Sequence, residues 1–439
     1  MTTHRSPGPG QAPAPGCPVG RGADPTPQGR LIPIHGPDFS ANPGATYAAL
    51  RKLGPIAPVE IAPGVAGYLT TTYRAALHLL RNTPSLFAKN PEHWVALRSG
   101  QVPADSPAAV MMMPRDNALW MDGAAHTRLR SAITDSLAQV DTHALTEMVT
   151  QVADELIDAF VEQGEVDLVA QYTEPLPMLV LARLFGCSPD ITRDLLTSIA
   201  MLFDTDENAA EANAAVLKAC MALITLKQRR PGRDITSWLL AHPTRLTDEE
   251  MTQQILLTVG AASTPSTNLS SNALALIHGE KEIRGGLFEG VMPVSDAVDH
   301  VLWTDPPVSN YSPLYALTYQ AYEGVTLPPG VPILVSFAAA NGDPEHHMTG
   351  NQYVGNRGHL AFSAGVHGCP APGLARVIAE TAIERVLDRL PDLTLSCRPE
   401  QLVRRPGTFH SGWTSLPFTF EPTAPSTRAS ATPASSTTV

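Results

Sequence analysis

One cysteine, Cys369, lies in a segment whose residue types suit metal ligation. It directly precedes an amphipathic stretch, residues 373–390, that predicts a helix. A cysteine just ahead of a helix lies in the positive end of the helix dipole, which stabilises its thiolate form, and a thiolate is a ligand for iron. The alternative is a buried structural cysteine. That alternative is our expectation for the other four cysteines: Cys17, Cys187, Cys220 and Cys397.

The residues around Cys369 make the first interpretation more specific, because a cysteine thiolate is one of the known axial ligands of haem. In type and spacing they resemble the haem-binding loop of bacterial cytochromes P450, a match carried by Phe362, Gly365, His367, Cys369, Leu374, Ala375 and Arg376. The resemblance implies haem b (iron protoporphyrin IX), with Cys369 as the iron ligand. It also implies that Phe362, Gly365 and His367 line the cofactor, His367 at a propionate.

A second motif runs from Asp122 to Arg130 and contains His126 four residues before Arg130. This spacing places both side chains on one helix face, where they could jointly hold an anionic group. In the resembled family this pair binds haem propionates. Taken alone, the two residues would more often belong to a solvated helix face, so their order relative to Cys369 gives them weight.

The segment 255–268 resembles the long helix that crosses the haem in this family. Gly260 and Ala261 have little or no side chain, which leaves room for dioxygen, and Pro265 lacks an amide donor and should kink the helix. The resemblance implies that Gly260, Ala261, Ser263 and Thr264 line the oxygen pocket. The alternative is a buried helix with a proline bend.

Several positions depart from the family pattern. The family's Glu-x-x-Arg pair is replaced by His300 and Trp303, and Gln352 stands where a later arginine would complete the network. Loss of one member of a buried ion pair is costly, whereas replacement of the whole set can be neutral, so a rebuilt core is expected here. A third propionate-binding residue, an arginine before a strand, is replaced by Leu314.

The oxygen-binding segment departs as well. Ala262 stands where the family has an acid, and Ser263 stands in place of its threonine. Ser263, Thr264 or an ordered water would then have to donate the protons. Pro370 and Pro372 have no amide hydrogen to offer the sulfur of Cys369, which predicts a more electron-rich thiolate.

Composition limits the partners. The formal charge is -12 over 439 residues, which argues against a nucleic-acid partner. The start of the chain lacks the features of a secretory signal, and no apolar run approaches the roughly 20 residues of a membrane span. Five scattered cysteines without a CxxC pair suit a reducing compartment. We therefore expect a soluble cytoplasmic protein that binds neither nucleic acid nor membrane.

The order of elements predicts a mainly α protein with small β-sheets at its edge. Helices are expected at about 46–53, 145–160, 174–186, 211–227, 249–278 and 373–390, and strands near 64–72, 324–337 and 393–396. Residues 1–30 and 422–439 are rich in Pro, Gly, Ser and Thr and predict disordered tails. The resemblance spans about Pro43 to Phe420, and it implies a single triangular cytochrome P450 domain over 31–421.

The resemblance implies a haem-thiolate monooxygenase that hydroxylates or epoxidises a small organic molecule, in secondary metabolism. It implies dioxygen as co-substrate and electrons from NAD(P)H by way of a ferredoxin reductase and a ferredoxin. Arg128, Arg357 and Arg376 could form a docking patch for that donor. Two alternatives stay open. One is an oxidative-coupling or peroxide-driven haem enzyme, prompted by Ala262; the other is a catalytically impaired auxiliary protein for a partner enzyme, prompted by the lost Glu-x-x-Arg pair.

Overall fold

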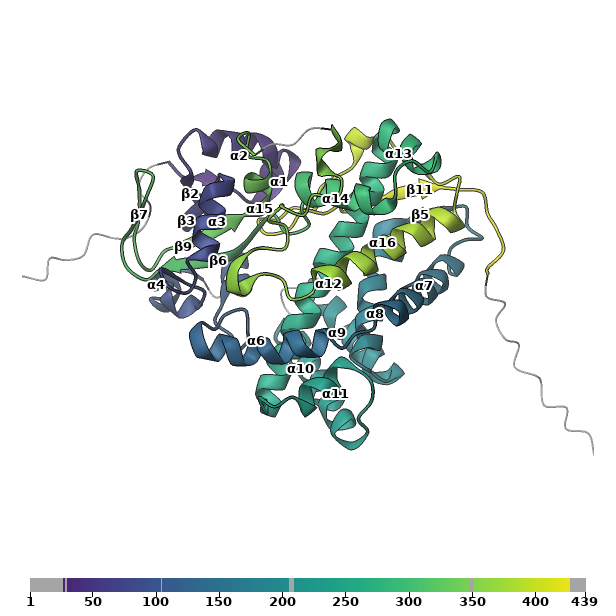
Figure 1. Ribbon diagram of the computed structural model, residues 1–439, viewed down its shortest axis with the longest axis horizontal. Coiled ribbons are helices and arrows are strands. Elements are labelled where there is room, and N and C mark those ends of the chain that lie inside the picture. Colours follow the sequence, from purple (N-terminus) through teal and green to yellow (C-terminus); the bar gives the residue numbers. More distant parts are fainter. Residues whose placement is uncertain (1–26, 28–29, 104, 205–208, 347–349, 427–439) are drawn as a thin grey trace, which may run out of the picture.

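Helices make up most of the described chain (Figure 1). The computed structural model describes residues 27, 30–103, 105–204, 209–346 and 350–426. Most of both predicted tails lies outside the described residues, so the domain boundaries at 31 and 421 stay predictions. The helices of the first half are α1 (Gly36–Ala41), α2 (Pro43–Arg51), α3 (Tyr73–Arg81), α4 (Val95–Arg98), α5 (Pro107–Met112), α6 (Gly123–Leu137), α7 (Thr142–Asp158), α8 (Pro175–Leu184) and α9 (Pro189–Asp204).

The second half holds the longest helix and the helix that follows Cys369. Its helices are α10 (Ala209–Arg229), α11 (Ile235–Ala241), α12 (Asp248–Gly279), α13 (Lys281–Phe288), α14 (Val294–Thr304), α15 (Phe337–Asn341) and α16 (Pro372–Arg389). In Figure 1 the outline is broad at the level of α2 and α13 and narrows toward α10 and α11, which gives the molecule a roughly triangular shape.

Three small sheets lie at the edges of this helical body. The largest has the strand order β1-β2-β3-β9-β6-β4, the second β10-β11-β5, and β7 pairs with β8. The strands are β1 (Ile32–Pro33), β2 (Ile56–Ala62), β3 (Val65–Thr70), β4 (Phe87–Ala88), β5 (Glu165–Asp167), β6 (Asn310–Ala316), β7 (Gln320–Tyr322), β8 (Val325–Leu327), β9 (Pro332–Ser336), β10 (Thr394–Leu395) and β11 (Pro417–Thr419).

The mainly α class with small sheets is therefore confirmed, but the strand prediction was incomplete. It missed β6, because Pro313 lies inside this strand and a proline removes a ladder hydrogen bond. The structure accommodates Pro313 beside a register irregularity between Asn310 and Pro313. The prediction for 145–160 was also too long, since α7 ends at Asp158 and turns follow up to Gly164, whose φ is +77°.

Helix α12 is the central element that positions the site. Its N-terminus is closed by a capping box in which Thr247 and Glu250 each accept a hydrogen bond from the other's backbone N–H. The helix continues through Pro265 without interruption. Its C-terminal half, from Ser266 to Ala275, is buried, whereas Gly260 and Ala261 in its middle are exposed. A long buried helix with an exposed middle indicates an internal opening at that point.

Helix α16 is tied to α7 by a group of ion pairs. Arg385 and Arg389 both contact Asp154, at 2.8 Å and 2.6 Å, and Arg389 also contacts Asp158 at 2.6 Å. One side of both helices packs into a shared apolar cluster that includes Val149, Ile157, Ala379, Ile383 and Val386. This packing fixes the direction of α16 and with it the loop that precedes the helix.

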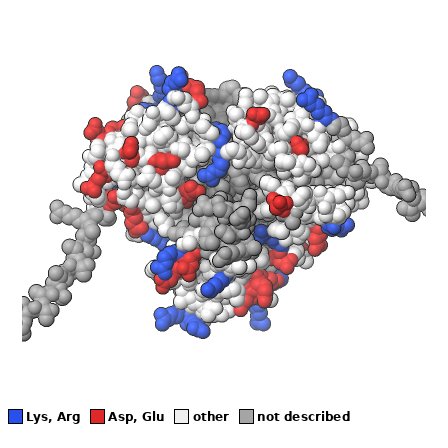
Figure 2. Space-filling model, turned by 180° about the vertical axis from the view of Figure 1, so that it is seen from behind, with Lys and Arg blue, Asp and Glu red and all other residues white. Residues whose placement is uncertain are grey.

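On the surface, basic and acidic side chains both occur around the edge of the face shown in Figure 2, so this face carries no field of a single sign. Within the described ranges, none of the helices combines the length and the apolar composition that a membrane crossing would require.

Candidate active site

The loop that carries Cys369 is held by its own backbone. The N–H of Cys369 donates to the carbonyl of Phe362 at 2.8 Å, and the N–H of Ala371 donates to the Cys369 sulfur at 3.4 Å. Gly365 has a φ of +71°, and a side chain there would collide with the carbonyl oxygen of Leu80. Glycine is therefore required for the loop to pass this close to α3. The expectation that the flanking prolines deprive the sulfur of amide donors is corrected, because Ala371 supplies one.

The protonation of Cys369 differs from the simple helix-end argument. Burial raises the pKa of its thiol, while the N–H of Ala371 and the charge of Arg130 oppose that rise without reversing it. Iron binds the thiolate, so ligation would have to displace a proton. The residue nevertheless exposes part of its surface. A metal could therefore reach the sulfur directly.

Beside the loop lies a group that we call the histidine cluster: Asp122, His126 and His367. The two imidazole rings have centroids 4.0 Å apart, and His367 Nε2 lies 3.6 Å from Asp122 Oδ1. Among the described residues His126 Nε2 is buried without a hydrogen-bond partner, and His367 Nε2 and Asp122 Oδ1, also buried, have only each other at a distance too long for a hydrogen bond. Buried polar atoms are normally satisfied in native proteins, so this cluster is built to meet a polar group from outside the chain.

Electrostatics favours an anion as that group. Burial, the neighbouring His367 and Arg130 lower the pKa of His126 to about 4. Burial likewise lowers the pKa of His367, although Asp122 opposes the change. An anion placed beside the two rings would oppose both shifts and could accept hydrogen bonds from the ring nitrogens. The cluster is therefore suited to a carboxylate.

Arg130 extends from the same helix, α6, toward the cysteine loop. Its Nη2 donates a short hydrogen bond to the carbonyl of Gly368, and its Nε donates to Thr134 at 3.1 Å. The prediction that His126 and Arg130 share one helix face is thus confirmed in outline. The two side chains diverge, however, since His126 meets His367 whereas Arg130 holds the residue before Cys369.

The predicted oxygen-pocket residues form the exposed middle of α12. A methyl group placed on Gly260 would have no heavy atom within 4 Å, which shows open space at that position. Ser263 and Thr264 are half-buried beside it. Pro265 has no amide hydrogen to donate to the carbonyl of Ala261. Ala262 and Leu374, the latter near the start of α16, pack against one apolar cluster. The middle of α12 and the start of α16 therefore border the same apolar cluster.

These observations fit a haem. An accessible thiol lies on a tightly held loop, buried histidine nitrogens without protein partners lie beside it, and open space lies over Gly260. Haem presents the matching groups, namely an iron that takes one thiolate ligand, two carboxylates and a flat ring. Cys369 would hold the iron, and His126 and His367 would hold a propionate.

Known proteins support the same reading. No family model matches the chain. Among curated proteins it is 28% identical over 394 residues to cytochrome P450 monooxygenase PikC of Streptomyces venezuelae, covering 87% of this chain and 92% of that protein. It is also 28% identical over 385 residues to 2-hydroxy-5-methyl-1-naphthoate 7-hydroxylase of Streptomyces carzinostaticus, covering 84% and 93% of the two chains.

Solved structures agree in fold. CYP154C4 from Streptomyces sp. W2061 matches with a TM-score of 0.80 at 26% identity, over 89% of this chain and 97% of that one. CYP154A1 from Streptomyces coelicolor A3(2) matches with a TM-score of 0.78 at 27% identity, over 89% and 100%. The chain belongs to the bacterial cytochromes P450. As in its named relatives, the activity of this cytochrome P450 is that of a monooxygenase that depends on haem.

In this cytochrome P450 a group of ion pairs lies next to His300 and Trp303, the positions where we predicted loss of the Glu-x-x-Arg pair. Asp299, next to His300, forms a short ion pair with Arg376 of α16, and Glu380 contacts the same guanidinium at 2.9 Å. Asp299 also accepts the N–H of Gly355 at 3.1 Å. We call Asp299, Arg376 and Glu380 the arginine cluster. It ties α14, α16 and the loop around residue 355 together.

His300 and Trp303 themselves contact the same loop. The ring of His300 packs on Tyr353 with centroids 4.7 Å apart, and Trp303 Nε1 donates to the carbonyl of Asn356 at 2.8 Å. The sequence predicted a rebuilt core here, and these contacts join His300 and Trp303 to the loop, but the rebuilding itself stays a prediction. Sequence reasoning did not identify Asp299, whose only signal was an acid beside the expected position.

Three further positions were misjudged or missed. Arg376 is buried and ion-paired, so it cannot belong to a docking patch for an electron donor. Asp122 was part of a quoted motif but had no assigned role. Lys89 is buried near the histidine cluster, and nothing in its local sequence marked it as a site residue.

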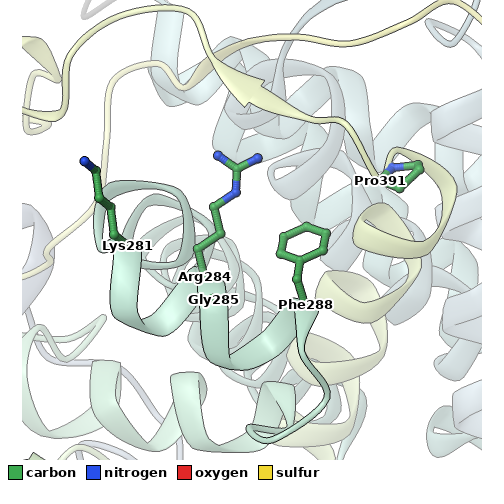
Figure 3. A pocket seen from close by; sticks show the side chains of 5 residues that line it. All are labelled: Lys281, Arg284, Gly285, Phe288 and Pro391. Carbon is green, nitrogen blue, oxygen red and sulfur yellow. The ribbon is translucent and has the colours of Figure 1, made fainter.

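A surface pocket of about 380 Å³ lies away from this site. Figure 3 shows its lining side chains, with Arg284 and Phe288 of α13 facing the chain at Pro391. Pro391 follows the C-terminal end of α16, whereas Cys369 precedes its N-terminal end. The 18 residues of the helix span about 27 Å. The pocket therefore takes no part in the chemistry at Cys369.

Proposed function

We propose that this cytochrome P450 binds haem b through the sulfur of Cys369 and oxidises a small organic molecule of secondary metabolism. One oxygen atom of dioxygen would enter a C–H or C=C bond, and the other would leave as water, with two protons and two electrons. The electrons would come from NAD(P)H by way of a ferredoxin reductase and a ferredoxin. The observation that carries the proposal is the accessible Cys369 thiol beside buried, unpartnered histidine nitrogens.

When bound, haem supplies the oxygen-activating redox chemistry, and the protein contributes binding, orientation and proton supply. His126 and His367 would fix one edge of the cofactor, and Arg130 would hold the cysteine loop through Gly368. The opening at Gly260 and Ala261 would admit dioxygen.

Proton supply would depend on hydroxyl groups. Ala262 offers no acid at this turn of α12, so the hydroxyls of Ser263 and Thr264, directly after it, are the donors nearest in sequence. A donor must come within about 3 Å of the atom that it protonates, directly or through one water. Both residues are half-buried and follow the exposed glycine by only a few positions.

The names of the relatives point to a class of substrate. They include a naphthoate hydroxylase, a vitamin D(3) 25-hydroxylase and a polyketide biosynthesis cytochrome P450. The two substrates that these names print, a methylated hydroxynaphthoate and vitamin D(3), both have mostly apolar carbon skeletons. We propose a substrate of this kind, taken up from the cytoplasm.

The decisive test is the absorbance spectrum of the reduced protein with carbon monoxide. A thiolate ligand is expected to give the red-shifted Soret band of this ligation, and Cys369→Ala should abolish that band. Cys397→Ala, at a half-buried cysteine far along the chain, is the matched control and should leave it unchanged. A wild-type protein that binds no haem, or a Cys369→Ala variant with the wild-type band, would disprove the proposal.

One observation favours a second candidate, oxidative coupling of a phenolic or indolic substrate. Ala262 packs among apolar side chains, so the usual acid is absent where proton delivery would begin. If monooxygenation is nevertheless the activity, Ala262→Asp should raise the fraction of consumed NADPH that appears as product. An unchanged ratio would favour the coupling reaction. The auxiliary-protein alternative offers no reason to retain unpartnered histidine nitrogens beside Cys369.

A further inference from the structure

Lys89 is a buried lysine without an obvious counter-charge. It follows β4 and is 3% exposed, and its Nζ donates a short hydrogen bond to Ser312 Oγ. The acid that acts on it is Asp122, whose Oδ2 already accepts the backbone N–H groups of Lys89 and Asn90 at 2.8 Å and 3.1 Å. A buried ammonium without a dedicated anion is costly, so its retention needs a reason.

Burial lowers the pKa of Lys89 to about 7, while Asp122 raises it again in part. An anion bound next to Nζ would restore the ammonium form. Lys89 therefore resembles the histidines of the histidine cluster: burial lowers its pKa, and the nearby carboxylate of Asp122 offsets that effect only in part.

The side chain of Lys89 lies close enough to the histidine cluster to affect it. The charge of Lys89 contributes to the lowered pKa values of both His126 and His367. The charged and titratable groups that face one another here are thus Lys89, His126, Arg130 and His367 against the single carboxylate of Asp122. With both histidines neutral and Lys89 protonated, two cations, Lys89 and Arg130, face one carboxylate, which leaves room for one further negative charge, that of a single propionate.

The strand pairing shows why Lys89 lies at this point. β4 runs antiparallel to β6, with Phe87 opposite Ala316 and Ala88 opposite Tyr315. The next step along this ladder leads from Lys89 toward Leu314. Leu314 is 1% exposed in an apolar cluster, at the position where the resembled family has an arginine. A cation has been lost from one strand, and another cation lies across from it on the neighbouring strand.

We propose that Lys89 binds a carboxylate of the haem and replaces the arginine that is absent at Leu314. The inference rests on the proposed haem binding and adds a residue that no sequence motif marks. In the bound protein the Nζ of Lys89 would donate hydrogen bonds to Ser312 Oγ and to one propionate. Lys89 is a positioning residue and takes no part in the reaction itself.

The test measures haem loss from the purified holoprotein to an excess of haem-free myoglobin. Lys89→Met keeps the length of the side chain and removes its charge, and it should accelerate haem loss about tenfold, the effect of one charge-assisted hydrogen bond. The double variant with Lys89→Met and Leu314→Arg should recover most of the wild-type rate, because the cation returns on β6. Lys52→Met, at an exposed lysine after α2, is the control and should behave as wild type.

A second readout separates a propionate contact from a merely structural lysine. The propionate bending band in the resonance Raman spectrum should shift in Lys89→Met and return in the double variant. An unchanged haem-loss rate together with an unchanged band would overturn the inference. If Lys89→Met does not fold, Lys89→Arg decides: it should retain haem with a shifted propionate band, and an unshifted band refutes the contact.

The proposed function and this inference fail in different ways. If the wild-type protein binds no haem, the proposed function is wrong. If the wild-type protein and Lys89→Met both show the thiolate band with carbon monoxide and lose haem equally fast, only the role of Lys89 is wrong.

Discussion

The histidine cluster and the arginine cluster both adjoin the loop and helix that carry Cys369, yet they treat buried polar groups in opposite ways. In the described part of the chain His126 Nε2 is buried without a partner, and His367 and Asp122 face each other only across 3.6 Å. Asp299 and Arg376, by contrast, are 3% and 9% exposed at their side chains and form an ion pair with each other. Unmatched polar atoms that gather beside Cys369 suit a ligand from outside the chain, whereas matched charges hold the fold together.

The comparison also predicts that one region tolerates sequence change better than the other. In the arginine cluster the usual pair is gone, but α14, α16 and the loop around Gly355 are still joined by charge and hydrogen bonds. Any set of residues that neutralises its own charges can serve there. The histidine cluster must match a group of fixed shape and charge, so only residues that supply equivalent donors can replace one another.

The largest expected effect is on stability, at the arginine cluster. Asp299→Ala leaves the buried Arg376 with Glu380 as its remaining acidic partner among the described residues, and it should lower the free energy of unfolding by about 3–5 kcal/mol. Denaturant unfolding of the holoprotein measures this change. Asp190→Ala removes an exposed pair with Arg193 and should cost less than about 1 kcal/mol. Equal costs for the two variants would remove the distinction between the clusters.

A smaller effect, on ligand retention, is expected at the histidine cluster. His126→Phe fills similar space without polar atoms, so it should leave the unfolding free energy nearly unchanged while haem loss accelerates about tenfold. His278→Phe is the matched control, because both nitrogens of His278 are also buried without partners, but far along α12. Faster haem loss in the control would show that the effect is not specific to the cluster.

The smallest effect concerns pH and the same control residue. Burial, with a contribution from Arg284, lowers the pKa of His278 to about 4, whereas an unfolded histidine titrates near 6.5. The unfolded state therefore binds more protons between these values, and stability falls as pH drops through this window. At the upper edge of this window, between about pH 8 and about pH 6, His278 should account for a loss of about 1 kcal/mol in the free energy of unfolding. His278→Phe should reduce that slope in pH-dependent unfolding, and an unaltered slope would contradict the assignment.

Local sequence patterns were enough to predict the long helices and to single out Cys369, the residue that we propose as the iron ligand. Helical periodicity predicted α10, α12 and α16 to within about two residues at their ends, because amphipathic spacing is a local property. The loop from Phe362 to Cys369 could be recognised for the same reason, since its glycines and its cysteine lie within a few positions of one another in the chain. By the same logic the class of fold could be predicted from the sequence alone, and Cys369 could be proposed as the iron ligand.

Long-range pairing was not readable in this way. Lys89 and Ser312 are 223 residues apart, and Arg376 and Asp299 are 77 apart. Nothing near Lys89 in sequence distinguishes it from a surface lysine; only the pairing of β4 with β6 buries it. The strand β6 itself was missed, since Pro313 breaks the local pattern. The structure accommodates this proline beside a register irregularity in the pairing of β6 with β9.

The sequence alone thus determined which residues could ligate iron and on which helices the surrounding groups lie, because both depend on neighbours within a few positions. Tertiary structure alone decided which of the many charged residues are desolvated, and whether a partner meets them. Desolvation and pairing set the free energy of a buried charge, and both arise only when distant segments pack together.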